Sequence, residues 1–386
     1  MPFLLPPPSG GEVDVLIVAG EHSGDEHGGR MIRELRSRHP GVKVAALGGP
    51  ELAAAGAQLL YDLTASSVVG LVEVLRNYPF FKKLFNETLH WIDQHRPRAV
   101  CFIDYPGLNL RLAAALRERG LSIKGGGKIK TVYYISPQIW AWKAGRRFPM
   151  ARNLDAMAVI FPFEVKCYAD TTLPVEFVSH PFVAPDYSAP VHYDPAGPVL
   201  LLPGSRKQAV GRIFPALLHG FRLFGERSAV VLYPSDDILQ VLEAADPPGN
   251  VRLVRIGQKS SSTAEPVAAS AVLTSSGTMS MHCALAGIPG AIVYRANPLT
   301  YVLGKMLVKV EYLGISNLLL NEPMYPEYIQ HAATPKALAA QLHLSVHDAG
   351  RRERTTEQSI RLRTLLREAG AGSAADWLRR HLELGP

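Results

Sequence analysis

The chain has 386 residues, and its 41 lysines and arginines against 34 aspartates and glutamates give a formal net charge of +7. Hydrophobic residues make up 47% and charged residues 19%, a globular balance that excludes a wholly disordered chain. No uninterrupted apolar run approaches the roughly 18–20 residues of a membrane-spanning helix, and three distant cysteines exclude a disulfide framework or a cysteine zinc site.

The first ten residues are rich in proline and lack the basic segment of a signal peptide, so we expect a cytoplasmic protein. Residues 13–19 then predict a buried strand, residues 20–29 a glycine-rich turn and residues 31–38 a helix. Further strands are predicted at residues 42–47, 99–103, 131–135, 157–161 and 175–178. Strands that alternate with helices across short turns predict a doubly wound α/β domain with a mostly parallel sheet.

Residues 184–198 are dense in proline and predict a linker. The alternation then restarts, with strands predicted at residues 199–202, 229–233, 251–254, 271–274 and 291–294 and a helical tail from about residue 334. We therefore expect domains over residues 11–184 and 198–345, followed by C-terminal helices over residues 346–386. Ligands of such sheets bind at the carboxyl ends of the strands, and a two-domain protein holds its site in the cleft between its domains.

Two polar segments follow predicted strands in the first half. The turn that begins at Gly20 contains Gly24 and the polar residues Glu21, Ser23 and Asp25, which favours contact with a hydroxylated ligand, although a tight strand-to-helix turn explains it as well. Asp104 directly follows the strand at residues 99–103. A carboxylate in this place can act as a general base or cap the following helix, and the residues alone leave both interpretations open.

Two similar turns follow strands in the second half. One contains Ser205 and Arg206, and the other contains Ser276, Gly277 and Thr278. Backbone N–H groups at helix N-termini together with an arginine suit a diphosphate. Helix capping explains either turn alone, but two such turns at equivalent strand ends favour a ligand.

An apolar segment with basic flanks covers residues 68–85. It predicts either core packing or a surface that meets a bilayer or an acyl chain, with Val68, Val69, Leu71, Val72 and Leu75 as its apolar residues. A cluster of Trp140, Trp142, Lys143, Arg146 and Arg147 fits base stacking or an interfacial anchor. We interpret the histidines as scattered, and we expect no metal and no other cofactor.

A set of short segments runs along nearly the whole chain. The most specific are Ser136-Pro-Gln-Ile-Trp-Ala-Trp142 and Phe161-Pro-Phe-Glu164. Others are Ala19-Gly-Glu-His-Ser-Gly-Asp25, Val69-Gly-Leu-Val-Glu-Val-Leu75, Ile103-Asp-Tyr-Pro106, Phe177-Val-Ser-His-Pro181, Leu201-Leu-Pro-Gly-Ser-Arg206, Ser276-Gly-Thr278 and Asn317-Leu-Leu319. In this order, these segments resemble those of the lipid-A-disaccharide synthases, a glycosyltransferase family of lipopolysaccharide assembly.

The resemblance implies a GT-B fold, with two Rossmann-like domains, a cleft between them and a C-terminal helix that crosses back. It implies inverting transfer of 2,3-diacylglucosamine from UDP to 2,3-diacylglucosamine 1-phosphate, at the cytoplasmic face of the inner membrane and without nucleic acid; a homo-oligomer is left open. By resemblance, Asp104 matches an essential aspartate, Arg206 an arginine near the nucleotide and Asn317 a nucleotide-side asparagine.

The chain departs from the family pattern at three positions. His282 stands where the family usually has an acidic residue that contacts the ribose, and a neutral imidazole keeps one acceptor nitrogen for that role. Ala209 stands where a glutamate usually follows Gly-Ser-Arg, and Gly107 replaces a second aspartate after Asp104. Two alternatives therefore remain, a GT-B enzyme with a different UDP-sugar donor and an inactive membrane-associated homologue.

Overall fold

The structure, a computed structural model, describes residues 4–67, 78–256, 265–297, 311–368 and 370–385. The chain forms two compact units. Unit 1 contains residues 1–181 and 368–386, and unit 2 contains residues 182–367. Each unit has a parallel sheet and its own hydrophobic core.

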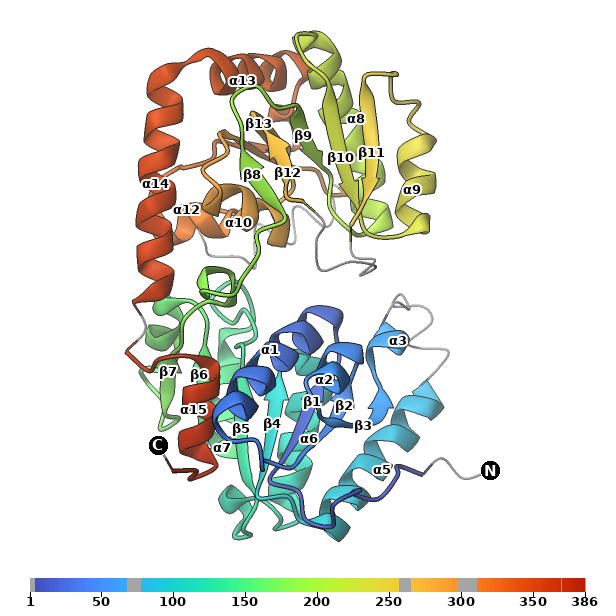
Figure 1. Cartoon of the computed structure of the whole chain (residues 1–386), viewed down its shortest axis with the longest axis vertical. Coiled ribbons are helices and arrows are strands. Elements are labelled where there is room, and N and C mark those ends of the chain that lie inside the picture. The colour runs from blue at the N-terminus through green and yellow to red at the C-terminus, as the bar shows by residue number, and fades with distance from the viewer. Residues whose placement is uncertain (1–3, 68–77, 257–264, 298–310, 369, 386) are drawn as a thin grey trace. The chain divides into compact units, whose positions relative to one another are not determined.

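The sheet of unit 1 has seven parallel strands in the order β3-β2-β1-β4-β5-β6-β7 (Figure 1). The two central strands, β1 and β4, are buried along their whole length because every side chain is apolar and both faces of the sheet are covered. The strands are β1 (Val15–Ala19), β2 (Val44–Gly48), β3 (Gln58–Asp62), β4 (Ala99–Ile103), β5 (Lys130–Tyr134), β6 (Ala156–Val159) and β7 (Val175–Phe177).

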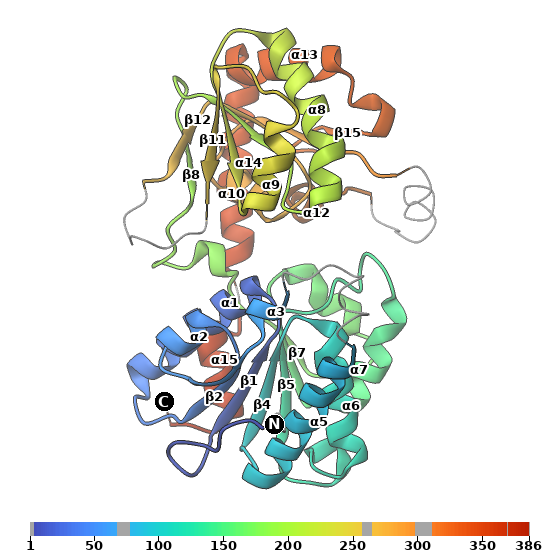
Figure 2. The same cartoon turned by 90° about the vertical axis from the view of Figure 1, so that its right-hand side faces the viewer.

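Helices cover both faces of this sheet (Figure 2). One face carries α1 (His22–Arg38), α2 (Pro50–Ala54) and α15 (Ala374–His381), and the other carries α5 (Tyr78–His95), α6 (Pro106–Glu118) and α7 (Arg147–Asn153). The short helix α3 (Thr64–Ser67) follows β3. The C-terminal helix α15 is tied to α1 by an ion pair of 2.6 Å between Arg38 and Asp376.

Unit 2 repeats the same plan with a six-stranded parallel sheet in the order β11-β10-β9-β13-β14-β15. Its strands are β9 (Val199–Leu202), β10 (Ala229–Tyr233), β11 (Val251–Arg255), β13 (Ala271–Thr274), β14 (Gly290–Tyr294) and β15 (Glu327–Ile329). On one side α8 (Lys207–Phe224) packs against α9 (Asp236–Glu243) and α13 (Pro335–His347). On the other, α14 (Ala349–Arg367) packs against α10 (Thr278–Leu285) and α12 (Ile315–Leu320).

Three predicted boundaries differ from the structure. The proline-rich residues 184–198 are not a free linker, because they contain β8 (Val191–Tyr193), which pairs with β12 (Val267–Ala269) inside unit 2. The chain returns to unit 1 at residue 368 rather than 346, since α14 packs within unit 2 and only α15 belongs to unit 1. The helix α1 begins at His22, inside the predicted glycine-rich turn.

The expected C-terminal helix that returns to the first domain is therefore present as α15. Among the residues that the structure describes, no helix combines the length and the apolar character needed to cross a membrane.

Candidate active site

The polar residues predicted in unit 1 follow two strands that are hydrogen-bonded neighbours. Ala19 of β1 pairs with Ile103 of β4, so Gly20 and Asp104 leave the sheet side by side. In the order of the strands, β1 and β4 flank the point where the connections change direction. A crevice forms outside the carboxyl ends of the strands at such a point, and it is the usual ligand site of an open α/β sheet.

The backbone at Asp104 is held in an unusual conformation. Asp104 and Tyr105 both have positive φ, 45° and 48°, which costs a non-glycine residue roughly 1–3 kcal/mol and clusters at functional sites. The Asp104 carbonyl accepts hydrogen bonds from the Tyr133 hydroxyl at 2.5 Å and the Asn109 amide at 2.8 Å. Neighbouring side chains therefore stabilise a turn that the local sequence disfavours.

The turn also decides between the two interpretations of Asp104 as a general base or as a helix cap. The N-cap of α6 is Tyr105, not Asp104, so the capping interpretation of Asp104 is wrong. The Tyr105 ring lies against Gly20, where a Cβ atom would be 2.0 Å from the ring. Gly20 is thus required by the close approach of Tyr105.

The Asp104 carboxyl is a weaker acid than an ordinary aspartate. Burial, followed by repulsion from the Glu21 carboxylate, raises its pKa from 3.8 to about 6, while a hydrogen bond from the Tyr105 N–H acts in the opposite direction. A carboxyl with this pKa is mostly ionised at neutral pH and is a stronger proton acceptor than an ordinary aspartate. The geometry and the charge state both suit a general base.

A second buried carboxyl belongs to Glu164, in the 3-10 helix Pro162–Tyr168. Its side chain is 2% exposed and accepts a hydrogen bond of 3.2 Å from the Phe161 N–H. Burial raises its pKa to about 8, and the charge of Asp104 contributes to the rise. The unit thus holds one carboxyl that is ionised at neutral pH and one that is largely protonated, a pattern of separated pKa values typical of acid–base sites.

The remaining residues of the predicted acceptor turn have different environments. Glu21 is the N-cap of α1, and Glu21 and Ser23 are exposed, whereas Gly24 is buried. Asp25 is fully buried, and its carboxylate accepts hydrogen bonds of 2.8–3.1 Å from the N–H groups of Gly49, Glu51 and Leu52 at the start of α2. Within the described structure Asp25 therefore fixes α2, and only Glu21 and Ser23 are open to a ligand.

The two polar turns of unit 2 are also neighbours. Leu202 of β9 pairs with Thr274 of β13, the strands that flank the switch point of this sheet. The turns are in close contact, because a Cβ atom at Gly204 would lie 3.1 Å from the Ser275 hydroxyl.

Each of these turns leads into a helix. Arg206 is the N-cap of α8, and Gly277 is the N-cap of α10. Ser205, Arg206, Gly277 and Thr278 are exposed and Ser276 is half-buried. The N-terminal ends of α8 and α10, which carry partial positive charge, and the Arg206 guanidinium therefore lie at the same carboxyl edge of the sheet. This arrangement suits a diphosphate.

The other two donor-side predictions lie deeper in unit 2. His282 is 5% exposed; its ring is 4.1 Å from that of Phe182 and stacks on that of Tyr187, whose hydroxyl lies 3.2 Å from Nε2. Asn317 is fully buried; it donates to the Tyr325 carbonyl and to Glu327 and accepts from the Tyr325 N–H. The polar atoms of Asn317 are used inside the fold, so this residue positions α12 and β15.

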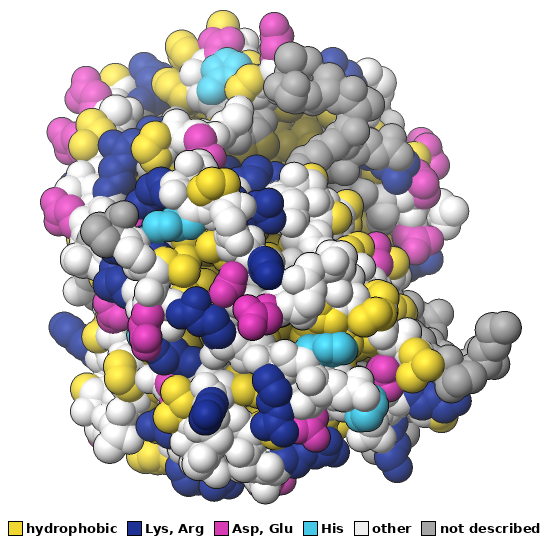
Figure 3. Space-filling view, turned by 60° about the horizontal axis from the view of Figure 1, so that its bottom comes forward, with side chains coloured by type: hydrophobic (Ala, Val, Ile, Leu, Met, Phe, Trp, Pro, Cys, Tyr) yellow, Lys and Arg dark blue, Asp and Glu magenta, His cyan; other side chains and the backbone are white. Residues whose placement is uncertain are grey.

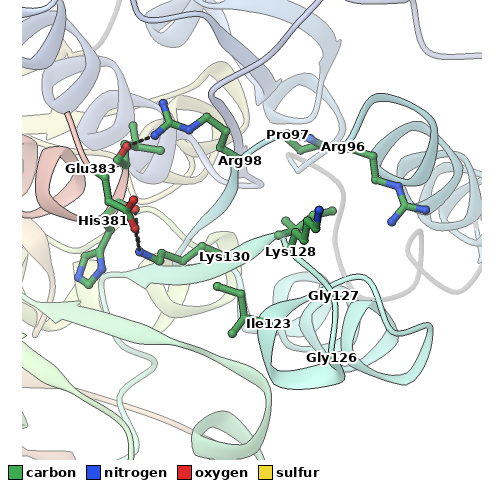
Figure 4. Close-up of a pocket in the computed structure, with 12 residues that line it drawn as sticks. Arg96, Pro97, Arg98, Ile123, Gly126, Gly127, Lys128, Lys130, His381 and Glu383 are labelled. Atoms are coloured by element: carbon green, nitrogen blue, oxygen red, sulfur yellow. Dashed lines mark hydrogen bonds and ion pairs between the residues drawn. The ribbon is translucent and has the colours of Figure 1, made fainter.

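The opposite edge of the unit 1 sheet holds a pocket of about 650 Å³ (Figure 4). Two of the cations that line it contact the C-terminal segment, since Arg98 donates to the Leu382 carbonyl at 2.5 Å and Lys130 to the His381 carbonyl at 3.1 Å. On the face shown in Figure 3, acidic side chains lie among the lysines and arginines of the described residues. The C-terminal residues His381, Leu382 and Glu383 line one side of this pocket, which lies at the amino ends of β4 and β5, away from Asp104.

Two exposed aromatic side chains lie in or beside the predicted Trp140–Arg147 cluster, Trp142 within it and Phe148 next to it. Trp142 is 45% exposed with Lys143 Nζ 4.4 Å from its ring centroid, and Phe148 is 44% exposed with the Arg147 guanidinium 4.2 Å from its ring. The predicted membrane residues Val68, Val69, Leu71, Val72 and Leu75 lie outside the described residues.

Comparison with known proteins gives a consistent result. A family model described as lipid-A-disaccharide synthetase matches residues 15–380. The chain is 35% identical to a lipid-A-disaccharide synthase of Geobacter metallireducens (92% of this chain, 94% of the relative) and 34% identical to one of Nitrosococcus oceani (93% of each chain).

Solved structures with the same fold include the glycotransferase of kitacinnamycin (TM-score 0.57, 17% identity, 98% of this chain and 100% of the other). They also include the UDP-GlcNAc 2-epimerase of Neisseria meningitidis (TM-score 0.58, 11% identity, 91% and 99%). These likenesses show the predicted fold class, two Rossmann-like units of the GT-B type.

Proposed function

Because this chain belongs to the lipid-A-disaccharide synthetase family, whose model spans both units, we propose that it is an inverting glycosyltransferase of that reaction. The donor is UDP-2,3-diacylglucosamine and the acceptor is 2,3-diacylglucosamine 1-phosphate. The products are the β(1→6)-linked disaccharide 1-phosphate and UDP. The observation that carries the proposal is the Asp104 carboxylate at the end of β4, with its pKa raised to about 6.

Unit 1 provides the base. Asp104 accepts the proton of the acceptor 6-hydroxyl while the hydroxyl oxygen attacks the anomeric carbon from the face opposite the diphosphate. The bond between the anomeric carbon and the diphosphate oxygen breaks, and its electron pair leaves with UDP. Attack from the opposite face inverts the configuration from α to β. Tyr133 and Asn109 are positioning residues, because they hold the Asp104 backbone and not its carboxylate.

Unit 2 provides the charge that stabilises the leaving group. We propose that Arg206, together with the N–H groups that follow Gly277 at the start of α10, binds the diphosphate of UDP. These groups rather than a metal ion are expected to balance the charge that develops as UDP departs. His282 is expected to meet the ribose from its place on α10, which requires Phe182 or Tyr187 to shift away from its ring.

The acylated substrates suggest where the enzyme acts. We propose that it binds peripherally to the cytoplasmic face of the inner membrane. Trp142 and Phe148, exposed and flanked by cations, suit the interface between headgroups and acyl chains. The apolar segment that contains Val68 and Leu75 is predicted to meet the acyl chains.

The test is UDP release by the purified chain. We expect release only when UDP-2,3-diacylglucosamine and the monosaccharide 1-phosphate are both present. Turnover of an unacylated UDP-sugar with none of the acylated donor would contradict the proposal and favour a different donor.

The role of Asp104 has its own test. Asp104→Ala should abolish turnover and leave UDP binding nearly unchanged, whereas Glu26→Ala, a control at an exposed carboxylate of α1, should keep both. If UDP binding is lost together with turnover in the Asp104 variant, Asp104 is a structural residue and not the base.

A further inference from the structure

Two histidines lie one helical turn apart at the end of α13. His343 and His347 form the sequence His-Leu-Ser-Val-His, and their ring centroids are 4.6 Å apart. Residues four apart share one face of a helix, so both rings point the same way. This pair corrects the interpretation of the histidines as scattered.

A carboxylate faces this pair from another element. Glu226 lies just beyond Phe224, the last residue of α8. Its Oε2 is 2.5 Å from His347 Nε2, and its Oε1 is 3.9 Å from His343 Nε2. One ligand atom from each of the three side chains lies within 4.8 Å of the other two.

These positions are close to those that a metal ion requires. Zinc binds histidine nitrogen and carboxylate oxygen at about 2.0–2.2 Å with tetrahedral geometry, which places ligand atoms about 3.3 Å apart. The shorter separation must open and the longer one must close, and no pair of the three ligand atoms exceeds the tetrahedral value by more than about 1.5 Å. All three side chains are exposed, so rotation about their side-chain bonds can supply these shifts and an ion can enter from solvent.

The surrounding electrostatics also favour a cation. Both α8 and α13 end at this place, and the C-terminal end of a helix carries partial negative charge. Two cations close to Glu226 in the chain are bonded away from the cluster, since Arg222 donates to the Asp246 carbonyl and Arg227 to that of Pro195. The Arg352 side chain, from α14, lies at the end of α13, where it donates to the Val346 carbonyl next to His347. We propose that Glu226, His343 and His347 bind one divalent transition-metal ion of the Zn²⁺ class, with water in the remaining positions.

The proposed site is separate from the transfer reaction. Arg206 and Glu226 are at opposite ends of the 18-residue helix α8, whose length is about 27 Å. The ion would join the end of α8 to α13, two helices that already pack so closely that a Cβ atom at Gly220 would lie 2.6 Å from the Leu338 side chain. We therefore expect bound metal to stabilise unit 2 and to leave the rate of transfer unchanged.

The test is calorimetric titration of Zn²⁺ into the full, tag-free chain after treatment with a chelator. We expect one saturable site per chain, and His343→Ala and His347→Ala should each weaken binding at least about tenfold. His192→Ala, at an exposed histidine elsewhere in unit 2, should bind like the wild type. Cys167→Ser should also bind like the wild type, which excludes the half-buried thiol as the ligand.

Two further readouts make the result decisive. Bound Co²⁺ should show the visible absorption of a tetrahedral ion without thiolate-to-metal bands, and Zn²⁺ should raise the thermal unfolding midpoint of the wild type but not of the two histidine variants. No saturable binding, or equal affinity in the wild type and the histidine variants, would overturn the proposal and leave Glu226 and His347 as a simple hydrogen-bonded pair.

Discussion

Replacement of Asp104 by asparagine is expected to make the protein more stable while it abolishes transfer. The carboxyl has an ordinary pKa of 3.8 when unfolded and a pKa of about 6 in the folded chain, because of burial and of repulsion by Glu21. A raised acid pKa means that folding is opposed whenever the carboxyl is ionised. The difference between the two pKa values corresponds to about 3 kcal/mol at 25 °C.

The pH window follows from the same values. Below about pH 4 the carboxyl is protonated in both states and the penalty is absent; it grows between about pH 4 and 6 and is complete above that. At pH 7.5 the Asp104→Asn variant should therefore be up to about 3 kcal/mol more stable, or roughly 6–12 °C higher in Tm. At pH 4 the two proteins should differ little.

Tryptophan fluorescence is a suitable assay, because all four tryptophans of the chain, Trp91, Trp140, Trp142 and Trp377, lie in unit 1 together with Asp104. Denaturation of wild type and variant would be followed at both pH values, alongside UDP release. The quantity to compare is the stability difference between the variant and the wild type at each pH. If this difference is no larger at pH 7.5 than at pH 4, the view that the folded chain destabilises the Asp104 carboxylate is refuted.

Three other predictions concern single side chains. The kcat/KM of the wild type should fall about tenfold per pH unit below about pH 6, as Asp104 becomes protonated. Glu21→Gln should move the midpoint of this pH dependence to lower pH, because it removes a negative charge that repels the Asp104 carboxylate. An unchanged pH–rate profile in this variant would contradict the role of Glu21 in raising the pKa of Asp104. His282→Glu should tighten UDP binding, measured by calorimetry, if position 282 meets the ribose, and an unchanged Kd would place it elsewhere. Asp25→Ala should destabilise unit 1 by at least about 3 kcal/mol in urea denaturation, since it leaves three buried N–H groups of α2 without an acceptor; a smaller loss would show that solvent replaces the carboxylate.

The architecture could be predicted because its signals are local. The runs at residues 99–103, 199–202, 229–233 and 271–274 are strands with the predicted bounds, since short, continuous apolar stretches between turns are typical of buried parallel strands. The same logic placed Asp104 directly after a central strand and Arg206 and Gly277 in the short turns that follow two others. A residue that directly follows a strand of a parallel sheet lies at the carboxyl edge of the sheet, and this placement does not depend on the rest of the fold.

The missed features depend on contacts that are distant in sequence. Gly29 lies in α1 although glycine has a low helix propensity. A Cβ atom there would lie 2.7 Å from the Glu51 carbonyl, so the close packing of α1 against α2 requires glycine at this position and outweighs its propensity. The strand β8 pairs with β12, far along the chain, so its proline-rich surroundings predicted only a linker.

The side chains that hold Asp104 were missed for a similar reason. Tyr133 lies in the buried part of a strand, where a tyrosine predicts only core packing, and its hydrogen bond to the Asp104 carbonyl exists because β5 is the neighbour of β4. Asn109 gave a weak signal, as a polar residue among the apolar ones at the start of α6. The pKa of Asp104 required the whole environment, because burial is a tertiary property.

The central claim is that the chain transfers an acylated glucosamine with inversion and with Asp104 as base. The most direct measurement incubates the protein with UDP-2,3-diacylglucosamine and 2,3-diacylglucosamine 1-phosphate, counts UDP and disaccharide, and determines the anomeric configuration of the product by NMR. We predict one UDP per disaccharide, a β(1→6) linkage, and no product from Asp104→Asn. An α linkage, UDP without disaccharide, or undiminished product from the variant would contradict the account.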